Sequence, residues 1–217
     1  MQKLIHMRKQ LLFLLLIISS FIYAKPDSTS IFQGYSGGMM LHAGYLFGEN
    51  PSAILPSGEN ISPQGLTKGI GGALRINLFK HLRVGCEGFI STMNSKHTNM
   101  RHILQSGSYV RSGWGGLGID ACWRMTKAWP YIGASFGRGA IRTLSVVDGS
   151  ENDWQPEEVT MLTKQSFYYA DPYIGVDWCM TRRVHITFRL DWMLAFNRQQ
   201  LIQPTGPRLF FGFMFCH

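Results

Sequence analysis

The chain ends in PRLFFGFMFCH (207–217), in which a large apolar side chain recurs at every second position. One parity holds Leu209, Phe211, Phe213 and Phe215, and the other holds Arg208, Phe210, Gly212 and Met214. Successive side chains of a strand point to opposite faces, so this spacing predicts a strand with one uninterrupted apolar face. Because antiparallel sheets of soluble proteins commonly keep a polar face toward water, the stripe indicates a different surrounding medium.

Similar alternation along the chain predicts an all-β protein. The clearest instance is RVHITFRLDWML (183–194), where Val184, Ile186 and Phe188 alternate with His185 and Thr187. Alternation of this length is difficult to reconcile with a helix. The predicted strands are residues 35–47, 68–79, 82–92, 109–124, 130–142, 167–179, 183–195 and 207–216.

The connections between these strands take turns between short and long. The short ones are 80–81, 125–129 and 180–183, the long ones are 48–67, 94–107 and 147–165, and 197–206 is intermediate. Tight turns on one side and longer loops on the other are typical of barrels that span the bacterial outer membrane. The pattern therefore predicts an eight-stranded antiparallel up-and-down transmembrane β-barrel, with both termini in the periplasm.

The N-terminus has the order of a secretory signal peptide. Lys3, Arg8 and Lys9 precede the apolar stretch LLFLLLIISSFIY, and Ala24 is a small residue suited to cleavage. We predict a signal peptide at 1–24 and one β-barrel domain at 25–217. No other segment approaches the ~20 apolar residues of a spanning helix, so a membrane-embedded mature chain must be a closed barrel. The net charge of +8 is scattered rather than clustered, which does not favour nucleic-acid binding.

On these strands and loops the chain resembles the small outer-membrane barrels of the OmpA and OmpX type over residues 35–217. The segments GGMMLHAGYLFG (37–48), GSYVRSGWGGLGID (107–120) and GPRLFFGFMFCH (206–217) also resemble uncharacterised secreted barrel proteins of Bacteroidetes. The resemblance implies a C-terminal assembly signal at Phe211, Phe213 and Phe215, although Cys216 and His217 follow the last aromatic residue. It also implies two partners, outer-membrane lipid and the outer-membrane assembly machinery, and a monomeric barrel.

Charged residues of inward parity are the first candidate site. Eight strands enclose a lumen that side chains can fill, and charges buried there must be paired. We therefore predict a structural ion-pair network inside the barrel, and a proton path or narrow pore is the functional alternative. Its predicted members are Arg75, Glu87, Asp120, Arg124, Asp177, Arg189 and Asp191.

Cysteines form a second candidate group. Cys122, Cys179 and Cys216 share inward parity near the short-turn rim, with His185 nearby, whereas Cys86 faces outward. A disulfide or a metal site at this rim is left open. The sequence lacks a CxxC spacing and a His-rich tract, and Cys also serves as a small apolar filler. We therefore predict no metal and no cofactor.

An enzymatic interpretation depends on His185 and Thr187. Lipid A deacylases are eight-stranded barrels with a His-x-Ser element, but here the hydroxyl residue is Thr187 and the His has inward parity. We expect a non-enzymatic protein with a structural or surface-interaction role through its long loops, the third of which is the most acidic segment. The alternatives are a narrow, porin-like channel or small-ligand barrel, a lipid A-modifying enzyme, and a soluble periplasmic β-barrel.

Overall fold

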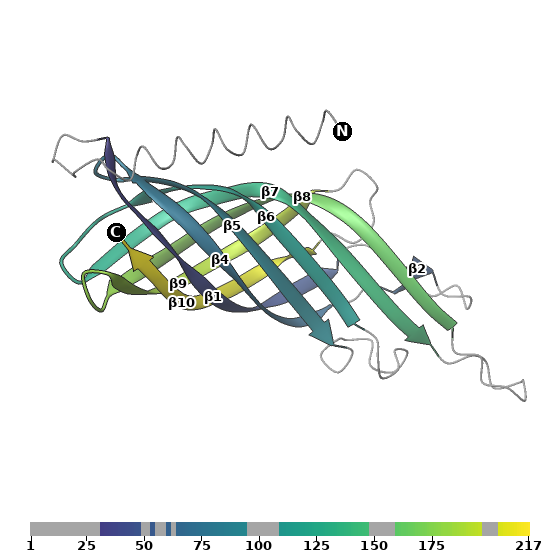
Figure 1. The fold of residues 1–217 in the computed structure, drawn as a ribbon. Helices are drawn as coiled ribbons and strands as arrows, with labels where there is room; N and C mark the ends of the chain where they lie inside the picture. Colours follow the sequence, from purple (N-terminus) through teal and green to yellow (C-terminus); the bar gives the residue numbers. More distant parts are fainter. Residues whose placement is uncertain are drawn as a thin grey trace, which may run out of the picture.

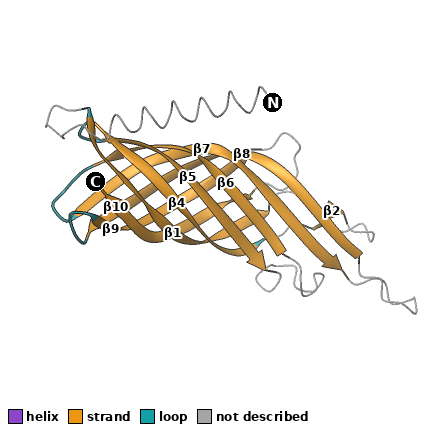
Figure 2. Cartoon of the chain, in the orientation of Figure 1, coloured by secondary structure: helices purple, strands orange, loops and turns teal. Residues whose placement is uncertain are grey.

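The computed structural model describes residues 31–48, 53–54, 60–61, 64–94, 109–147, 159–196 and 204–217. Eight antiparallel strands close into a barrel in the order β1-β10-β9-β8-β7-β6-β5-β4 (Figure 1), so the predicted fold class is confirmed. The strands are β1 (Phe32–Gly48), β4 (Gly65–Leu78), β5 (Leu82–Asn94), β6 (Tyr109–Cys122), β7 (Ala128–Val147), β8 (Val159–Cys179), β9 (Val184–Phe196) and β10 (Pro204–Cys216). Figure 2 shows the short connections gathered at one end of the barrel, which we call the short-turn end; the opposite end is the loop end.

Several strand bounds differ from the sequence-based ones. β6 ends at Cys122, two residues before the predicted end, whereas β7 and β8 are extended to 20 and 21 residues at the loop end. The first long connection contains a two-stranded sheet of β2 (Ala53–Ile54) and β3 (Asn60–Ile61). The predicted signal peptide and most of the long loops lie outside the described residues. Within the described ranges, no helix is long and apolar enough to cross a membrane.

The register shows that the strands are tilted around the barrel. Following directly opposed residues from Ala43 of β1 through β10, β9 and the remaining strands leads back to β1 at Phe32. The path therefore returns nearer the short-turn end than it began, as strand tilt requires in a closed barrel. In the reverse direction, from β4 toward β8, a row of opposed residues climbs toward the loop end.

The two faces of the barrel wall differ in chemistry. Outward positions hold most of the exposed large apolar side chains, whereas inward positions hold the buried charges. The C-terminal stripe lies on the outer face, where Phe211, Phe213 and Phe215 are 41%, 49% and 57% exposed. Phe210 and Met214 of the same strand point inward and are buried. This is the alternation of a barrel whose surroundings are apolar.

Cys216 and His217, which follow the last phenylalanine of the C-terminal stripe, complete the closure of the barrel. Tyr35 N–H donates to the His217 carbonyl at 3.0 Å, His217 N–H donates to the Tyr35 carbonyl at 2.9 Å, and the two rings stack. Gly34 has a φ of 102°, which favours glycine, and a Cβ at this position would lie 2.1 Å from the His217 carbonyl oxygen. His217 therefore continues the seam between β1 and β10.

Candidate functional site

A first group of charges fills the lumen toward the short-turn end. Arg83 donates from Nη1 to Asp177 Oδ2 at 2.6 Å, and its Nε donates to Asp120 Oδ1. Arg75 lies between the same two carboxylates, with N···O distances of 3.7 Å to Asp120 and 3.9 Å to Asp177. All four side chains are at most 5% exposed. We call these four residues the lower cluster.

Tyrosine rings hold the lower cluster in place. The guanidinium carbons of Arg75 and Arg83 lie 4.6 Å and 4.4 Å from the centre of the Tyr131 ring. Tyr173 donates from its hydroxyl to Asp120 Oδ2 at 3.1 Å. Cations over an aromatic face are attracted by the ring quadrupole, so these rings stabilise the two arginines without adding charge.

A second group of charges, the upper cluster, occupies the middle of the lumen. Arg189 pairs with Glu87, Asp171 and Asp191, and its side chain is fully buried. Arg208 donates to Asp171 at 2.6 Å and to Asp191 at 2.8 Å. The two arginines therefore share two carboxylates, which come from β8 and β9. Such sharing compensates charges that would be very costly to bury alone.

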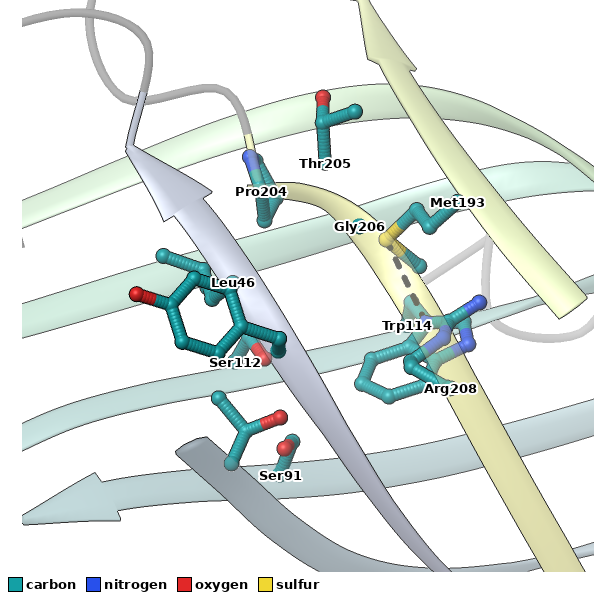
Figure 3. Close-up of a pocket in the computed structure, with 11 residues that line it drawn as sticks. Leu46, Ser91, Ser112, Trp114, Met193, Pro204, Thr205, Gly206 and Arg208 are labelled. Carbon is teal, nitrogen blue, oxygen red and sulfur yellow. Dashed lines mark hydrogen bonds between the residues drawn. The ribbon is translucent and has the colours of Figure 1, made fainter. Parts of the chain in front are cut away.

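Apolar and aromatic side chains close the lumen beside the upper cluster. The Arg208 guanidinium carbon lies 4.5 Å from the centre of the Trp114 ring, and Nη1 lies 3.4 Å from Met193 Sδ. Together with Ser91 and Ser112, these three residues line a small pocket toward the loop end (Figure 3), which we call the cup. The cavity in this cup is about 20 Å³, room for about one water molecule. The buried side chains of the two clusters and their aromatic neighbours thus occupy the interior at these levels of the barrel.

Six of the seven predicted interior charges lie in these clusters. Arg124 does not: it follows the end of β6, donates to Gln33 Oε1 at 2.7 Å, and lies over the Trp129 ring. The prediction for Arg124 is wrong because β6 ends two residues earlier than the alternation indicated, so parity no longer describes the position. Arg83, Asp171 and Arg208 also belong to these clusters, although they were not among the predicted members. Their inward parity was available, since Asp171 shares the parity of Asp177.

At the rim the Cys216 thiol makes two polar contacts, the longer of which reaches the Met214 carbonyl at 4.0 Å. Cys216 Sγ lies 3.4 Å from His185 Nδ1, while Cys122 is buried and Cys179 is partly buried. All four cysteines are free thiols in the structure. Across the described ranges, no three His, Cys, Asp or Glu side chains are grouped so as to hold a metal ion. The arrangement resembles rim packing more than a ligand set.

The His185–Thr187 pair lies inside the barrel rather than on its lipid side. Thr187 is fully buried and its hydroxyl is 3.1 Å from the Tyr131 hydroxyl, and the His185 ring packs edge-on against Trp129 at 4.6 Å. A side chain in this position cannot reach a lipid in the surrounding membrane. The geometry therefore does not support the lipid A-modifying alternative.

A shallow recess interrupts the outer wall between β8 and β9. The register runs from Ala170↔Leu194 to Tyr173↔Asp191, and in between Asp171 and Pro172 have no partner in β9, although both pair with β7. Proline has no N–H to donate to a ladder, which explains a local gap at Pro172. The recess has a volume of about 430 Å³ and its wall is mainly apolar.

No protein-family model and no curated protein matches the chain. Among solved structures, the chain is similar to the outer membrane protein OprG of Pseudomonas aeruginosa, with a TM-score of 0.59 and 7% identity over 88% of this chain and 99% of that one. It is also similar to Neisserial surface protein A, with a TM-score of 0.51 and 12% identity over 84% of this chain and 96% of that one. The likeness to small outer-membrane barrels is therefore confirmed for the fold. The likeness to Bacteroidetes proteins stays a prediction.

Proposed function

We propose that the protein is a monomeric outer-membrane barrel that acts as a closed scaffold, with a structural or surface-interaction role carried by its long extracellular loops. The alternation of apolar outward and charged inward side chains supports a membrane location, since a lipid-facing surface requires it. The short turns would then lie in the periplasm. The N-terminal segment 1–24 would be the signal that brings the chain across the inner membrane.

The β7–β8 hairpin is the observation that carries this proposal. Every residue from Ala128 to Val147 pairs with β8, and the last pair is Val147↔Val159. A tilted strand needs only ~9–11 residues to cross a bilayer, so this ladder is about twice the necessary length. Figure 1 shows the two strands reaching further than their neighbours at the loop end. A paired stalk of this kind would hold the third long loop away from the membrane.

The filled lumen supports a scaffold over a channel. Arg208 of the upper cluster contacts Trp114 and Met193 in the interior, and the cavity that these three residues line is about the size of one water molecule. A conducting pore needs a continuous aqueous path, as the wide barrels of porins have. The described part of this barrel resembles the small barrels whose side chains fill the interior.

Surface labelling on intact bacteria tests the proposal. A cysteine introduced by Asp153→Cys, in the loop that joins β7 and β8, should react with a membrane-impermeant maleimide on intact cells. The matched control is Thr126→Cys, in the short turn between β6 and β7, which should react only after the outer membrane is permeabilised. The parent chain gives the background of its four native cysteines. Labelling of Thr126→Cys but not Asp153→Cys on intact cells would reverse the orientation and overturn the proposal.

A further inference from the structure

Five cationic side chains project from the outer wall near the loop end and define what we call the basic face. All five are exposed and share the parity of outward apolar residues on their strands. They come from four strands that lie on one side of the barrel, between β4 and β8 (Figure 1). The members are Lys68 of β4, Arg111 of β6, Arg138 and Arg142 of β7, and Lys164 of β8.

Four of these residues fall on one cross-strand row. Lys68 is opposite Thr92, Thr92 is opposite Arg111, Arg111 is opposite Arg142, and Arg142 is opposite Lys164. Directly opposed side chains have Cβ atoms about 4.5–5.5 Å apart, and like charges in that relation destabilise a sheet. Three consecutive cations at Arg111, Arg142 and Lys164 therefore repel one another unless an anion lies between them.

The described part of the wall offers no such anion. Its five acidic residues, Glu87, Asp120, Asp171, Asp177 and Asp191, all lie in the interior clusters. Within the described ranges, no carboxylate comes within ion-pair distance of the basic face. The excess of positive charge is also one-sided. On β9, β10 and β1 the outward residues near the loop end are uncharged: Leu194, Phe196, Thr205, Pro207, Tyr45 and Phe47.

The depth of the basic face identifies the anion. Below it on the same strands the outward side chains are apolar, such as Ile70 of β4, Leu117 of β6 and Phe136 of β7. The Arg138 guanidinium carbon lies 5.7 Å from the centre of the Tyr168 ring, and exposed tyrosines are typical of the membrane–water interface. The cations therefore lie on the loop-end side of this apolar band, where lipid headgroups would meet the wall of a membrane-embedded barrel.

We propose that the basic face binds the phosphate groups of an anionic glycolipid of the outer leaflet. Arginine presents paired N–H donors that match the oxygens of a phosphate, and basic residues near an anionic membrane surface are attracted to it. A phosphate seated between Arg111, Arg142 and Lys164 converts their repulsion into shared attraction. The proposal rests on the membrane location proposed above but not on a function of the loops. It predicts bound lipid on one side of the barrel only.

Lipid retention by the purified full-length mature chain tests the proposal. The chain is refolded in detergent with bisphosphorylated lipid A or with chemically dephosphorylated lipid A, washed, and examined by native mass spectrometry. We expect the bisphosphorylated form to be retained about tenfold more strongly, because about 1.4 kcal/mol of phosphate-dependent binding corresponds to that ratio. The variant with Arg111→Gln, Arg138→Gln, Arg142→Gln and Lys164→Gln should lose this preference.

The short-turn end provides a control with the same change of charge. Lys80→Gln, Lys127→Gln, Arg182→Gln and Arg183→Gln remove four exposed cations from the opposite end and should leave the preference intact. If the first variant does not refold, as judged by the loss of a boiling-dependent gel shift, Arg142→Gln and Lys164→Gln are tested singly. Each should reduce the preference, and Arg142→Lys should restore part of it.

Three results would overturn the proposal. If both lipids are retained equally, phosphate does not contribute to binding. If both four-site variants lose the preference for bisphosphorylated lipid A to the same extent, the effect depends on net charge and not on the basic face. A preference that emerges only when the acidic residues of loop 148–158 are neutralised would make that loop the counterion of the basic face. Replacing loop 148–158 by a two-residue Asn-Gly turn distinguishes lipid binding by the basic face from the proposed function of the loops. The replacement should abolish any function of that loop and leave the preference for bisphosphorylated lipid A unchanged.

Discussion

Arg83 of β5 donates a 2.6 Å hydrogen bond to Asp177 of β8, across the lumen between strands that are separated in the wall by β6 and β7. A second bond from Arg83 reaches Asp120 of β6. One guanidinium therefore ties three strands through the interior, in addition to the backbone ladder around the wall. The lower cluster braces the barrel where its wall hydrogen bonds cannot, because those join only neighbouring strands.

The variant Asp177→Asn should destabilise the barrel. It keeps the shape of the side chain but removes the carboxylate that Arg83 and Arg75 share, and breaking a buried ion pair costs about 3 kcal/mol. The measurement is the free energy of unfolding by urea in phospholipid vesicles, followed by tryptophan fluorescence. The exposed turn variant Arg182→Gln is the control and should change the free energy by less than about 0.5 kcal/mol. Equal midpoints for the two variants would show that Asp177 does not brace the lumen.

The lumen should conduct only after its filling is removed. We expect no unit conductance steps from the wild-type barrel in planar bilayers, and steps from the double variant Trp114→Ala, Arg83→Ala, which removes one large buried side chain beside the upper cluster and one from the lower cluster. Phe211→Ala is the control, because that side chain lies on the outer wall and its loss leaves the lumen unchanged. Conductance steps of similar size from the wild type and the double variant would show that the wild-type lumen is open, and would favour the channel alternative.

Lipid-facing positions should tolerate charge according to depth. Phe211 is directly opposite Phe188 and Leu41, near the middle of their strands, so Phe211→Arg should cost about 2–4 kcal/mol of folding free energy. Phe196 ends β9 at the loop end, and Phe196→Arg should cost no more than about 1 kcal/mol. Both values come from urea unfolding in vesicles, with the boiling-dependent gel shift as the check on folding. Equal effects would mean that the C-terminal stripe is not at the membrane centre.

The C-terminal pair should contribute to closure of the barrel. Deleting Cys216 and His217 removes three backbone hydrogen bonds, two between His217 and Tyr35 and one from Cys216 N–H to the Arg183 carbonyl. At about 0.5–1.5 kcal/mol each, their loss should lower the free energy of unfolding by about 1.5–4.5 kcal/mol. His217→Ala keeps these backbone bonds and loses only the stacked ring, so its effect should be smaller. If His217→Ala destabilises the barrel as much as the deletion does, the ring contact rather than the backbone seam is responsible.

The sequence by itself determined the wall of this barrel. The parity of side chains along a strand is a local steric property, so alternation in 183–194 and in 207–217 was enough to predict which residues face out. Loop lengths added the order of the strands, because consecutive antiparallel strands joined by tight turns must be neighbours. Even where strand ends were misjudged, as at Arg124, the faces of the strand interiors were correct.

Only the tertiary structure decided which side chains meet. Parity places Arg83 and Asp177 inside the lumen, but the bond between them depends on the tilt and register of four strands. The Tyr131 ring contacts the guanidinium groups of Arg75 and Arg83 for the same reason, although the sequence does not distinguish Tyr131 from other aromatic residues of the strands. The basic face is likewise invisible in sequence, since Lys68 and Lys164 are joined into one row only through the registers of the strands between them. Local sterics fix the direction of a side chain, whereas its partner is fixed by the closure of the whole sheet.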